Sequence, residues 1–282
     1  MTNSSSERPS ILSSETTIAK DGGTEEHNRN TLVETESLEI LYRDDSLIAI
    51  NKPSGLLVHR SPIDRHETRF AIQLLRDQIG QRVYPAHRLD KPTSGVLLFA
   101  LDKDTASKMG EAFRQHQLSK TYLAVVRGHC PDQGTIDHAL REDPDSRIKR
   151  QEDAPAQDAI SHYRCLAKTV LDVEIETYPQ SRYSLVEVEP ETGRRHQIRR
   201  HLKHISHPII GDAKHGRGRH NRYFATELNC PRLLLHAQQL KFDHPITGAS
   251  MIINAPLDDC FYQLLKRFDW QDRVEKTFHP EK

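Results

Sequence analysis

The sequence predicts an α+β fold in which strands pair locally and single helices lie between them. Apolar and polar residues alternate at 38–42, a polar turn follows, and residues 47–50 resume the apolar pattern, so a β-hairpin is expected. Isolated stretches with apolar residues at helical spacing occur at 71–79 and 259–268. Hairpins interspersed with single helices favour α+β over a doubly wound parallel sheet, in which strands and helices alternate regularly.

Each remaining element follows from a local pattern. Ile72, Leu75 and Ile79 share one face of the helix at 71–79. A loop rich in functional side chains then runs into an apolar stretch at 96–100, which is typical of a buried strand. Asp104 can cap a helix that reaches about residue 118. Further strands are expected at 121–127, 161–167, 183–189 and 237–242, with a charged connector at 141–158.

The chain is expected to divide into one folded domain and two tails. Residues 1–37 are rich in Ser, Thr and Glu and hold few large apolar side chains, so they bury too little surface to offset the entropy lost on ordering. Seven acidic residues against three basic ones give this segment a net charge of −4. We therefore expect a disordered acidic tail at 1–37, a folded domain at 38–270 and a C-terminal tail at 271–282.

Composition and cysteine spacing exclude several classes of protein. A membrane-spanning helix needs roughly 18 apolar residues, and the longest apolar runs, such as residues 95–101, are far shorter. The N-terminal segment is too acidic for an organellar transit peptide and lacks the apolar core of a secretory signal. The 4 cysteines lie tens of residues apart, which is typical of free thiols in a reducing compartment. A cytoplasmic protein is therefore expected.

A neutral total charge conceals a strongly basic segment. The chain has 40 Lys and Arg against 40 Asp and Glu, yet residues 194–223 hold nine basic residues and a lone acid, Asp212. Such a cluster favours contact with phosphates of a nucleic acid, although a merely solvated helix face is the alternative interpretation. The candidate RNA-binding residues here are Arg194, Arg195, Arg200, Lys203, Lys214, Arg217, Arg219 and Arg222, the last three in a Gly/Arg-rich segment expected to be a loop.

Asp90 is the first candidate for chemistry. It lies in the sequence His87-Arg88-Leu89-Asp90, shortly before the strand at 96–100. Positive charge from Arg88 can keep the carboxylate ionised, and the strand can hold it at the end of a loop, which suits a nucleophile or a general base. The alternative interpretation is that Asp90 caps a turn before Pro92.

Arg199 is the second candidate. On a helix, Ile198, Leu202 and Ile205 form one apolar stripe, and Arg199 lies beside it at the boundary of the core. A guanidinium in that position needs a carboxylate partner, and Asp90 could serve, because a desolvated Asp–Arg pair keeps the acid charged.

Two further features have ordinary structural interpretations. His201, His204 and His207 recur every three residues, but steps of about 100° per residue spread them around a helix that Pro208 ends. Three convergent imidazoles are therefore not expected, and neither is a metal site. Tyr122 lies in a predicted strand, where a tyrosine is usually a core residue.

These segments, in this order, resemble the RluA-type family of pseudouridine synthases. The resemblance extends from residue 38 to about residue 256 and implies the family's fold, a mixed and mainly antiparallel sheet flanked by helices and loops, with 38–270 as the catalytic domain. The matching motifs are Asn51-Lys52-Pro53-Ser54-Gly55-Leu56-Leu57-Val58-His59, His87-Arg88-Leu89-Asp90 with Thr93-Ser94-Gly95, Lys120-Thr121-Tyr122, Thr192-Gly193-Arg194-Arg195-His196-Gln197-Ile198-Arg199, His207-Pro208-Ile209-Ile210-Gly211-Asp212 and Arg232-Leu233-Leu234-Leu235-His236-Ala237.

The resemblance implies that the protein isomerises uridine to pseudouridine in RNA. Asp90 is then the catalytic aspartate, Arg199 its ion-pair partner, and Tyr122 the tyrosine that stacks on the base and lies where it can take the C5 proton. His87 and Arg88 would lie where the flipped nucleotide leaves its helix. The reaction exchanges a C–N for a C–C bond without net redox change, so neither a cofactor nor a metal is expected.

Some motifs of this sequence indicate which RNA is the substrate. Val58-His59-Arg60-Ser61 and Ala213-Lys214-His215-Gly216 resemble the subfamily that modifies uridine 65 of tRNA. A ribosomal RNA target is the closest alternative, because such motifs define the chemistry better than the RNA. A non-catalytic RNA-binding protein and a histidine-dependent metalloenzyme acting on phosphodiesters are weaker alternatives. No protein partner and no membrane are implied, and we expect a monomer.

Overall fold

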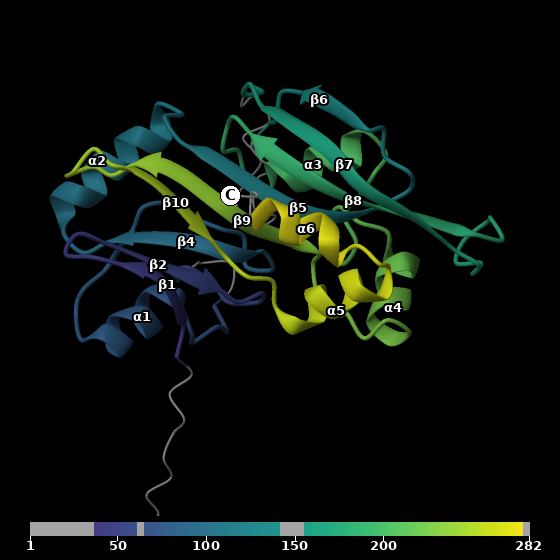
Figure 1. Ribbon diagram of the computed structural model, residues 1–282, viewed down its shortest axis with the longest axis horizontal. Helices are drawn as coiled ribbons and strands as arrows, with labels where there is room; N and C mark the ends of the chain where they lie inside the picture. Colours follow the sequence, from purple (N-terminus) through teal and green to yellow (C-terminus); the bar gives the residue numbers. More distant parts are fainter. Residues whose placement is uncertain (1–36, 61–64, 142–154, 279–282) are drawn as a thin grey trace, which may run out of the picture. The chain divides into compact units, whose positions relative to one another are not determined.

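The computed structural model describes residues 37–60, 65–141 and 155–278, so almost all of the predicted tail at 1–37 lies outside the described residues. The strands in these ranges form one ten-stranded sheet in the order β1-β2-β4-β9-β5-β8-β7-β6, with β10 paired to β9 and β3 to β4 (Figure 1). The strands are β1 (Glu39–Arg43), β2 (Leu47–Lys52), β3 (Tyr84–Pro85), β4 (Ser94–Ala100), β5 (Ser119–Arg127), β6 (Gln133–Asp137), β7 (Ile160–Leu171), β8 (Ser181–Pro190), β9 (Leu235–Asp243) and β10 (Ser250–Asn254).

The pairing of the strands confirms the predicted fold class. Each pair of neighbouring strands runs antiparallel except β4 and β9, which meet in parallel at Ser94–His236 and Gly95–Ala237. Gly95 has a φ of +111°, and a Cβ there would lie 2.2 Å from the carbonyl oxygen of Ala237. Only glycine allows so close an approach, so this residue lets the start of β4, which follows the loop that carries Asp90, lie against β9.

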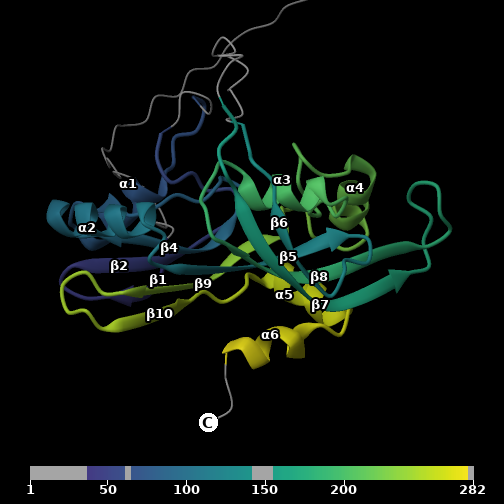
Figure 2. The ribbon, with the colours of Figure 1, turned by 90° about the horizontal axis from the view of Figure 1, so that it is seen from above.

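Helices cover both faces of the sheet. Helices α1, α2 and α3 lie on one face, and α5 and α6 lie on the other (Figure 2). No helix within the described ranges is both long enough and apolar enough to cross a membrane. The helices are α1 (Ala71–Ile79), α2 (Lys103–Arg114), α3 (Gln197–His204), α4 (Gly218–Thr226), α5 (Asp259–Arg267) and α6 (Gln271–Phe278).

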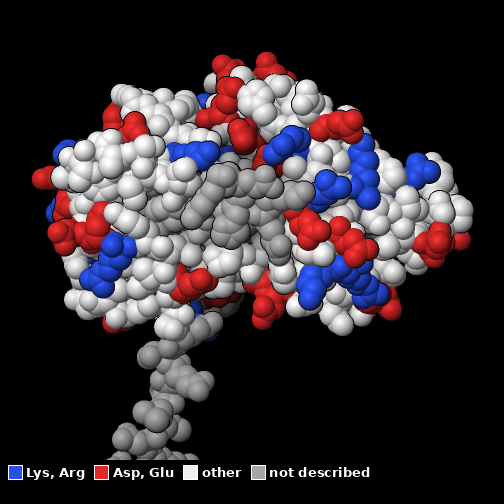
Figure 3. Space-filling model, in the orientation of Figure 1, with Lys and Arg blue, Asp and Glu red and all other residues white. Residues whose placement is uncertain are grey.

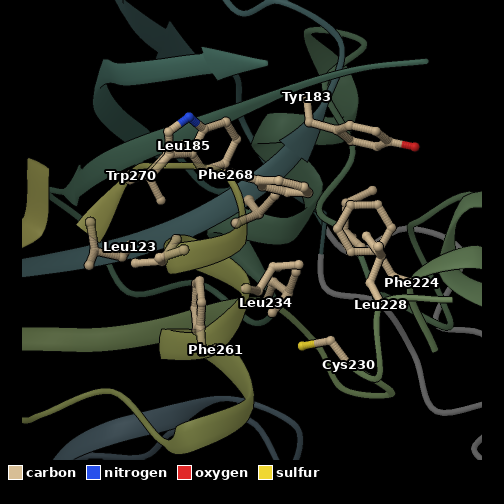
Figure 4. Packing of buried hydrophobic residues seen from close by; sticks show 14 of the residues in the cluster. Leu123, Tyr183, Leu185, Phe224, Leu228, Cys230, Leu234, Phe261, Phe268 and Trp270 are labelled. Carbon is tan, nitrogen blue, oxygen red and sulfur yellow. The ribbon is translucent and has the colours of Figure 1, made fainter. Parts of the chain in front are cut away.

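The largest apolar cluster joins β5 and β8 to the C-terminal helices. Leu123 and Leu185 project from the strands toward Phe261, Phe268 and Trp270, and each of these side chains is at most 8% exposed (Figure 4). Burying such a cluster is the main favourable contribution to folding, at roughly 25 cal/mol per Å² of apolar surface. The sheet behind the candidate site is therefore held rigidly from its far face.

The C-terminal segment differs from the sequence-based prediction. Residues 271–282 were expected to form a tail, but helix α6 occupies Gln271–Phe278 and Val274 is buried in the cluster around Trp270. The helical spacing of apolar residues ends near residue 268, so the sequence predicts a tail after it. Helix α6 forms nevertheless, because packing onto α5 stabilises it. The folded domain thus continues beyond residue 270.

Other boundaries shift for local reasons. Helix α2 is capped by Asp102, whose carboxylate accepts a hydrogen bond from the Thr105 amide at 2.8 Å, and not by Asp104. It ends at Arg114, four residues earlier than expected, because His116 takes a left-handed φ of +55° before β5 begins. The short strands β6 and β10 were not predicted, because their few apolar residues show no clear alternation.

Candidate active site

Asp90 lies in the loop between β3 and β4. Its main-chain carbonyl accepts a hydrogen bond from the Thr93 amide at 3.0 Å, so the backbone does form a turn before β4. The side chain, however, turns away from this loop and accepts a hydrogen bond from Nη1 of Arg199 at 2.9 Å through Oδ2. The carboxylate is 28% exposed and lines a cavity. The turn before β4 is thus closed by the main chain of Asp90, and the side chain is directed to Arg199 and the cavity.

Arg199 lies between two carboxylates. Besides Asp90, its guanidinium binds Asp212 in a bidentate manner, with Nε to Oδ2 at 2.7 Å and Nη2 to Oδ1 at 2.8 Å. The Arg199 side chain is 6% exposed and that of Asp212 is completely buried. The main-chain amides of Lys214 and His215 also donate to Oδ1 of Asp212, both at 2.9 Å. This network fixes the guanidinium so that its remaining amino group faces Asp90.

The pKa values of this pair follow from two opposing effects. Burial acts to raise the pKa of Asp212, but hydrogen bonds and charge from Arg199 outweigh it and hold the pKa below its ordinary value. Burial likewise acts to lower the pKa of Arg199, and the two carboxylates raise it instead. Both groups are therefore charged at neutral pH, and Asp90 faces a permanent positive charge.

Asp212 was not predicted as a site residue. The sequence held a signal for it, because Asp212 is the lone acid among nine basic residues in 194–223, and a buried guanidinium near that segment needs a counter-charge. Arg199 was already predicted to need a carboxylate partner, and only the fold shows that Asp212 binds it in addition to Asp90. Helix α3 begins after His196, so Arg195 and Lys203 are exposed while Arg199 points into the core. The alternative of a solvated basic face is wrong for Arg199.

Tyr122 forms another part of the site. It lies on β5 between β8 and β9, where the register with β9 shifts between Thr121 and Tyr122. The ring is half-buried, packs against two apolar clusters and lines the same cavity as Asp90. Burial raises the pKa of Tyr122, and the negative charge of Asp90 raises it further. The phenol therefore keeps its proton at neutral pH.

The cavity is large enough for a nucleotide. Its volume is about 920 Å³, within the range of pockets that bind small organic ligands. One wall comes from the loop that carries Asp90, and another from residues 190–199 at the start of α3. The end of α2 and the start of β5 add Phe113, Arg114, His116 and Lys120, which were not predicted as site residues.

A second loop holds the loop that carries Asp90 in place. Lys52 is fully buried, and its ammonium donates to the main-chain carbonyls of Pro53, Leu56 and Lys91 at 2.9, 2.8 and 3.1 Å. The Gly55 amide also donates to the carbonyl of Lys91, at 2.9 Å. Because Lys91 follows Asp90 directly, these bonds limit the movement of the aspartate. The motif beginning at Asn51 thus has a structural role beside the site.

His87, which was expected to lie where the flipped nucleotide leaves its helix, lines the same cavity as Asp90. Its Nε2 accepts a hydrogen bond from the Leu98 amide at 3.1 Å, and its ring stacks on Phe113 with centroids 4.8 Å apart. Burial, with a contribution from the charge of Lys120, lowers the pKa of His87 to about 3. A neutral ring that accepts from the backbone cannot offer a positive charge to RNA. His87 instead forms part of the cavity wall.

Of the other candidate RNA-binding residues, three line the cavity, five are exposed on or near α3 and α4, and Arg200 contacts the main chain. Arg88, Arg194 and Arg195 are exposed and line the cavity, while Arg200 donates to the carbonyl of Arg141 at 2.8 Å. The expected Gly/Arg-rich loop is instead mostly helix, because α4 covers Gly218–Thr226. The remaining members, all exposed and lying on α3, on α4 or between them, are Lys203, Lys214, Arg217, Arg219 and Arg222.

The three histidines at 201, 204 and 207 do not converge. His201 contacts the hydroxyl of Ser161 and the carbonyl of His138, each at 3.0 Å, and His204 stacks on His138 with centroids 3.7 Å apart. His207 contacts the carbonyl of Arg127 at 2.9 Å. Within the described ranges, no three His, Cys, Asp or Glu side chains are grouped as metal ligands would be.

The mixed sheet and the Asp–Arg pair at a large cavity are typical of an enzyme, and comparison with known families identifies which one. Residues 46–204 match the family described as RNA pseudouridylate synthase, and the chain belongs to this family. It is 48% identical over 244 residues to the tRNA pseudouridine synthase C of Vibrio vulnificus, covering 86% of this chain and 100% of that protein. It is 50% identical over 236 residues to the protein of the same name from Yersinia pestis, covering 83% and 91%.

Solved structures agree with this assignment. The human RNA Pseudouridylate Synthase Domain Containing 4 has a TM-score of 0.61 and 27% identity, covering 82% of this chain and 93% of that chain. The human RNA Pseudouridylate Synthase Domain Containing 1 has a TM-score of 0.61 and 26% identity, covering 83% and 96%. The predicted family, the fold class and the assignment as an RNA-modifying isomerase are confirmed.

Proposed function

We propose that the protein converts uridine 65 of tRNA to pseudouridine, with Asp90 as the essential acid. The observation that carries this proposal is the Asp90 carboxylate, ion-paired to a buried Arg199 at 2.9 Å inside a cavity of about 920 Å³. The relatives named tRNA pseudouridine synthase C support tRNA over ribosomal RNA as the substrate. A non-catalytic RNA-binding role is disfavoured, because nothing in RNA binding alone requires this buried charge network.

Asp90 has the properties that the isomerisation needs. The N1–C1′ bond of the uridine breaks, the base rotates, C5 joins C1′, and the proton from C5 is lost while N1 gains one. An ionised carboxylate can add to the base or attack C1′, and both routes use the same oxygen atoms. Arg199 supplies a counter-charge to the Asp90 carboxylate and orients it toward the cavity. Neither route needs a cofactor.

Tyr122 is best suited to hold the base. The raised pKa keeps the Tyr122 phenol protonated, and a protonated phenol is too weak a base to take the C5 proton directly. Its half-buried ring on the cavity wall can instead stack on the flipped uracil. Stacking of this kind contributes about 1–3 kcal/mol per base and offsets part of the unstacking cost of flipping.

The exposed basic residues of α3 and α4 are proposed to bind tRNA phosphates. Replacing both Arg219 and Arg222 by Ala should reduce the slope of log K against log salt concentration by about 2, because each phosphate contact contributes roughly one released counterion. Filter binding of an unmodified tRNA transcript between 50 and 200 mM salt, roughly the range over which such slopes are resolved, measures this slope.

A matched control is available for this prediction. Lys241 on β9 and Lys266 on α5 are exposed, and the face of the molecule that carries α5 shows Lys and Arg interspersed with Asp and Glu (Figure 3). Replacing these two lysines by Ala should leave the slope unchanged. Equal slopes for the two double variants would contradict an RNA interface on α4.

The remaining parts of the proposal concern the assembly and its location. We propose that a monomer acts in the cytoplasm, where its tRNA substrate is found, and that residues 38–278 contain the whole catalytic apparatus. The four free cysteines are consistent with a reducing compartment.

The test of the proposed function is pseudouridine formation by the full chain on unmodified transcripts. Carbodiimide adducts mapped by primer extension should appear at position 65 of tRNA and nowhere in ribosomal RNA. Product in ribosomal RNA alone would keep the reaction and reject the substrate. No product on either RNA, with the protein folded and binding tRNA, would leave only an RNA-binding role.

A further inference from the structure

His196 has an unusual backbone conformation directly beside the catalytic pair. Its φ of +54° and ψ of +27° place it in the left-handed region, which a few per cent of non-glycine residues adopt, with asparagine, aspartate and histidine the most frequent among them. It occupies the N-cap position of α3, yet its side chain makes no capping hydrogen bond. A residue in this conformation at a site is a reason to ask what its side chain contacts.

The ring of His196 lies between His215 and Asp90. Its Nδ1 is 3.2 Å from Nε2 of His215, and the two ring planes are 70° apart. Its Nε2 is 3.9 Å from Oδ2 of Asp90, the same oxygen that accepts from Arg199. The His196 side chain is 13% exposed and lines the cavity. One ring nitrogen of His196 therefore faces His215, and the other faces the Asp90 carboxylate.

The charge of its neighbours determines where the proton of His196 resides. Burial is the largest effect on His196, and together with Arg199, Arg195 and His215 it outweighs the opposing charge of Asp90 and lowers the pKa to about 4. The ring is thus neutral near pH 7, with one N–H. Negative charge at Asp90 favours the hydrogen on Nε2, because the other tautomer would point a lone pair at the carboxylate. Nδ1 then accepts a hydrogen bond from Nε2–H of His215.

We propose that His196 is a positioning residue for Asp90, whose Nε2–H closes onto the carboxylate when a nucleotide fills the cavity. Hydrogen bonds of catalytic groups are often long in the free enzyme and shorten in the complex with substrate. A closure of about 1 Å would bring 3.9 Å to hydrogen-bond length. The carboxylate would then be held from two sides, by the charged Arg199 and by a neutral donor. This inference rests on the proposed function of the same site.

Three substitutions separate the Nε2–H from the backbone role of His196. His196→Gln keeps a donor near the position of Nε2, whereas His196→Asn tolerates the left-handed conformation and keeps a donor only near Nδ1. His196→Gly relieves the backbone and removes the ring. Single-turnover rates on unmodified tRNA should fall about 10- to 100-fold for Asn and Gly and less than about threefold for Gln, with tRNA affinity changed less than about twofold in each.

Two results would overturn the proposal. A Gly or Asn variant with the wild-type single-turnover rate would show that the ring serves only the start of α3. Equal losses for Gln and Asn, in variants with unchanged thermal unfolding, would show that a donor at Nε2 is not what matters. Wild-type protein without any product would refute the proposed function instead, so the two failures are distinguishable.

A spectroscopic measurement tests the tautomer without any activity assay. In the full chain with ¹⁵N-labelled histidine, the His196 signals are assigned by their loss in the Asn variant. Nitrogen chemical shifts at pH 7 should show hydrogen on Nε2 and none on Nδ1, and His215→Leu should let the two tautomers mix. Hydrogen on Nδ1 of His196 in the wild-type protein would overturn the proposal.

Discussion

Replacing Asp90 by Asn is expected to abolish pseudouridine formation and to leave tRNA binding nearly unchanged. The amide keeps the shape of the carboxylate and can still accept a hydrogen bond from Nη1 of Arg199, but it has no negative charge and is a far weaker nucleophile. A loss of at least about 10³-fold in the single-turnover rate is expected. The assay is pseudouridine mapping on unmodified tRNA under excess enzyme, with tRNA affinity measured by filter binding.

The stability of the Asp90→Asn variant should change little. Arg199 retains its bidentate partner Asp212, so no buried charge is left without a counter-charge. We expect the free energy of unfolding to change by no more than about 1–2 kcal/mol. Asp104→Asn, an exposed change in the first turn of α2, is the matched control and should have full activity. Turnover within tenfold of wild type in the Asp90 variant would remove Asp90 from the mechanism.

Replacing Arg199 by Met is expected to remove both activity and a large part of the stability. The substitution leaves Asp212, whose side chain is fully buried, without its counter-charge. Breaking a buried ion pair in this way costs about 3–5 kcal/mol, because the remaining charge is still desolvated. Urea unfolding followed by circular dichroism measures this loss of stability. The single-turnover rate of the tRNA-bound variant should fall below the detection limit of the assay.

A double variant separates the two roles of Arg199. Arg199→Met combined with Asp212→Leu replaces the pair by apolar side chains, and such replacements of buried pairs are often neutral or stabilising. Stability should therefore return toward the wild-type value while turnover stays lost, because Asp90 has no cationic partner. Recovery of turnover along with stability would show that Arg199 acts only on the fold.

The pH dependence of unfolding also tests whether Arg199 is the counter-charge of Asp212. Lowering the pH should destabilise the wild-type protein and stabilise the Arg199→Met variant. In the wild-type protein the pKa of Asp212 is lowered, so its contribution is present above the unfolded pKa of about 4 and is lost as the pH falls through the folded pKa. In the Arg199→Met variant burial, the largest effect on the pKa of Asp212, is opposed only by the main-chain amides of Lys214 and His215, and we expect it to raise this pKa. That variant should gain stability when the pH is lowered from about 7 to about 5, because with a raised folded pKa the folded state binds more protons than the unfolded state. A flat profile would mean that Asp212 finds another cation.

The local parts of the fold could be predicted because neighbouring residues determine them. The helix over 71–79 has the predicted bounds, since its apolar positions share one face and Gly80 ends it with a φ of +65°. The hairpin of β1 and β2 follows from alternation and a polar turn. By contrast, α4 was expected to be a loop, because two glycines and three arginines show little periodicity. Packing of Phe224 into the cluster with Tyr183 stabilises that helix.

The sequence by itself determined the α+β class and the family, because element pattern and motif order are readable without coordinates. It also predicted that Arg199 needs a carboxylate and that Asp90 could serve, which the family resemblance implied as well. Only the tertiary structure decided that Asp212 clamps Arg199, that His87 is a neutral wall residue and that His196 faces Asp90. The physical reason is distance along the chain. Asp90 and Arg199 are 109 residues apart, and which groups surround their contact depends on where β4, β9 and α3 meet.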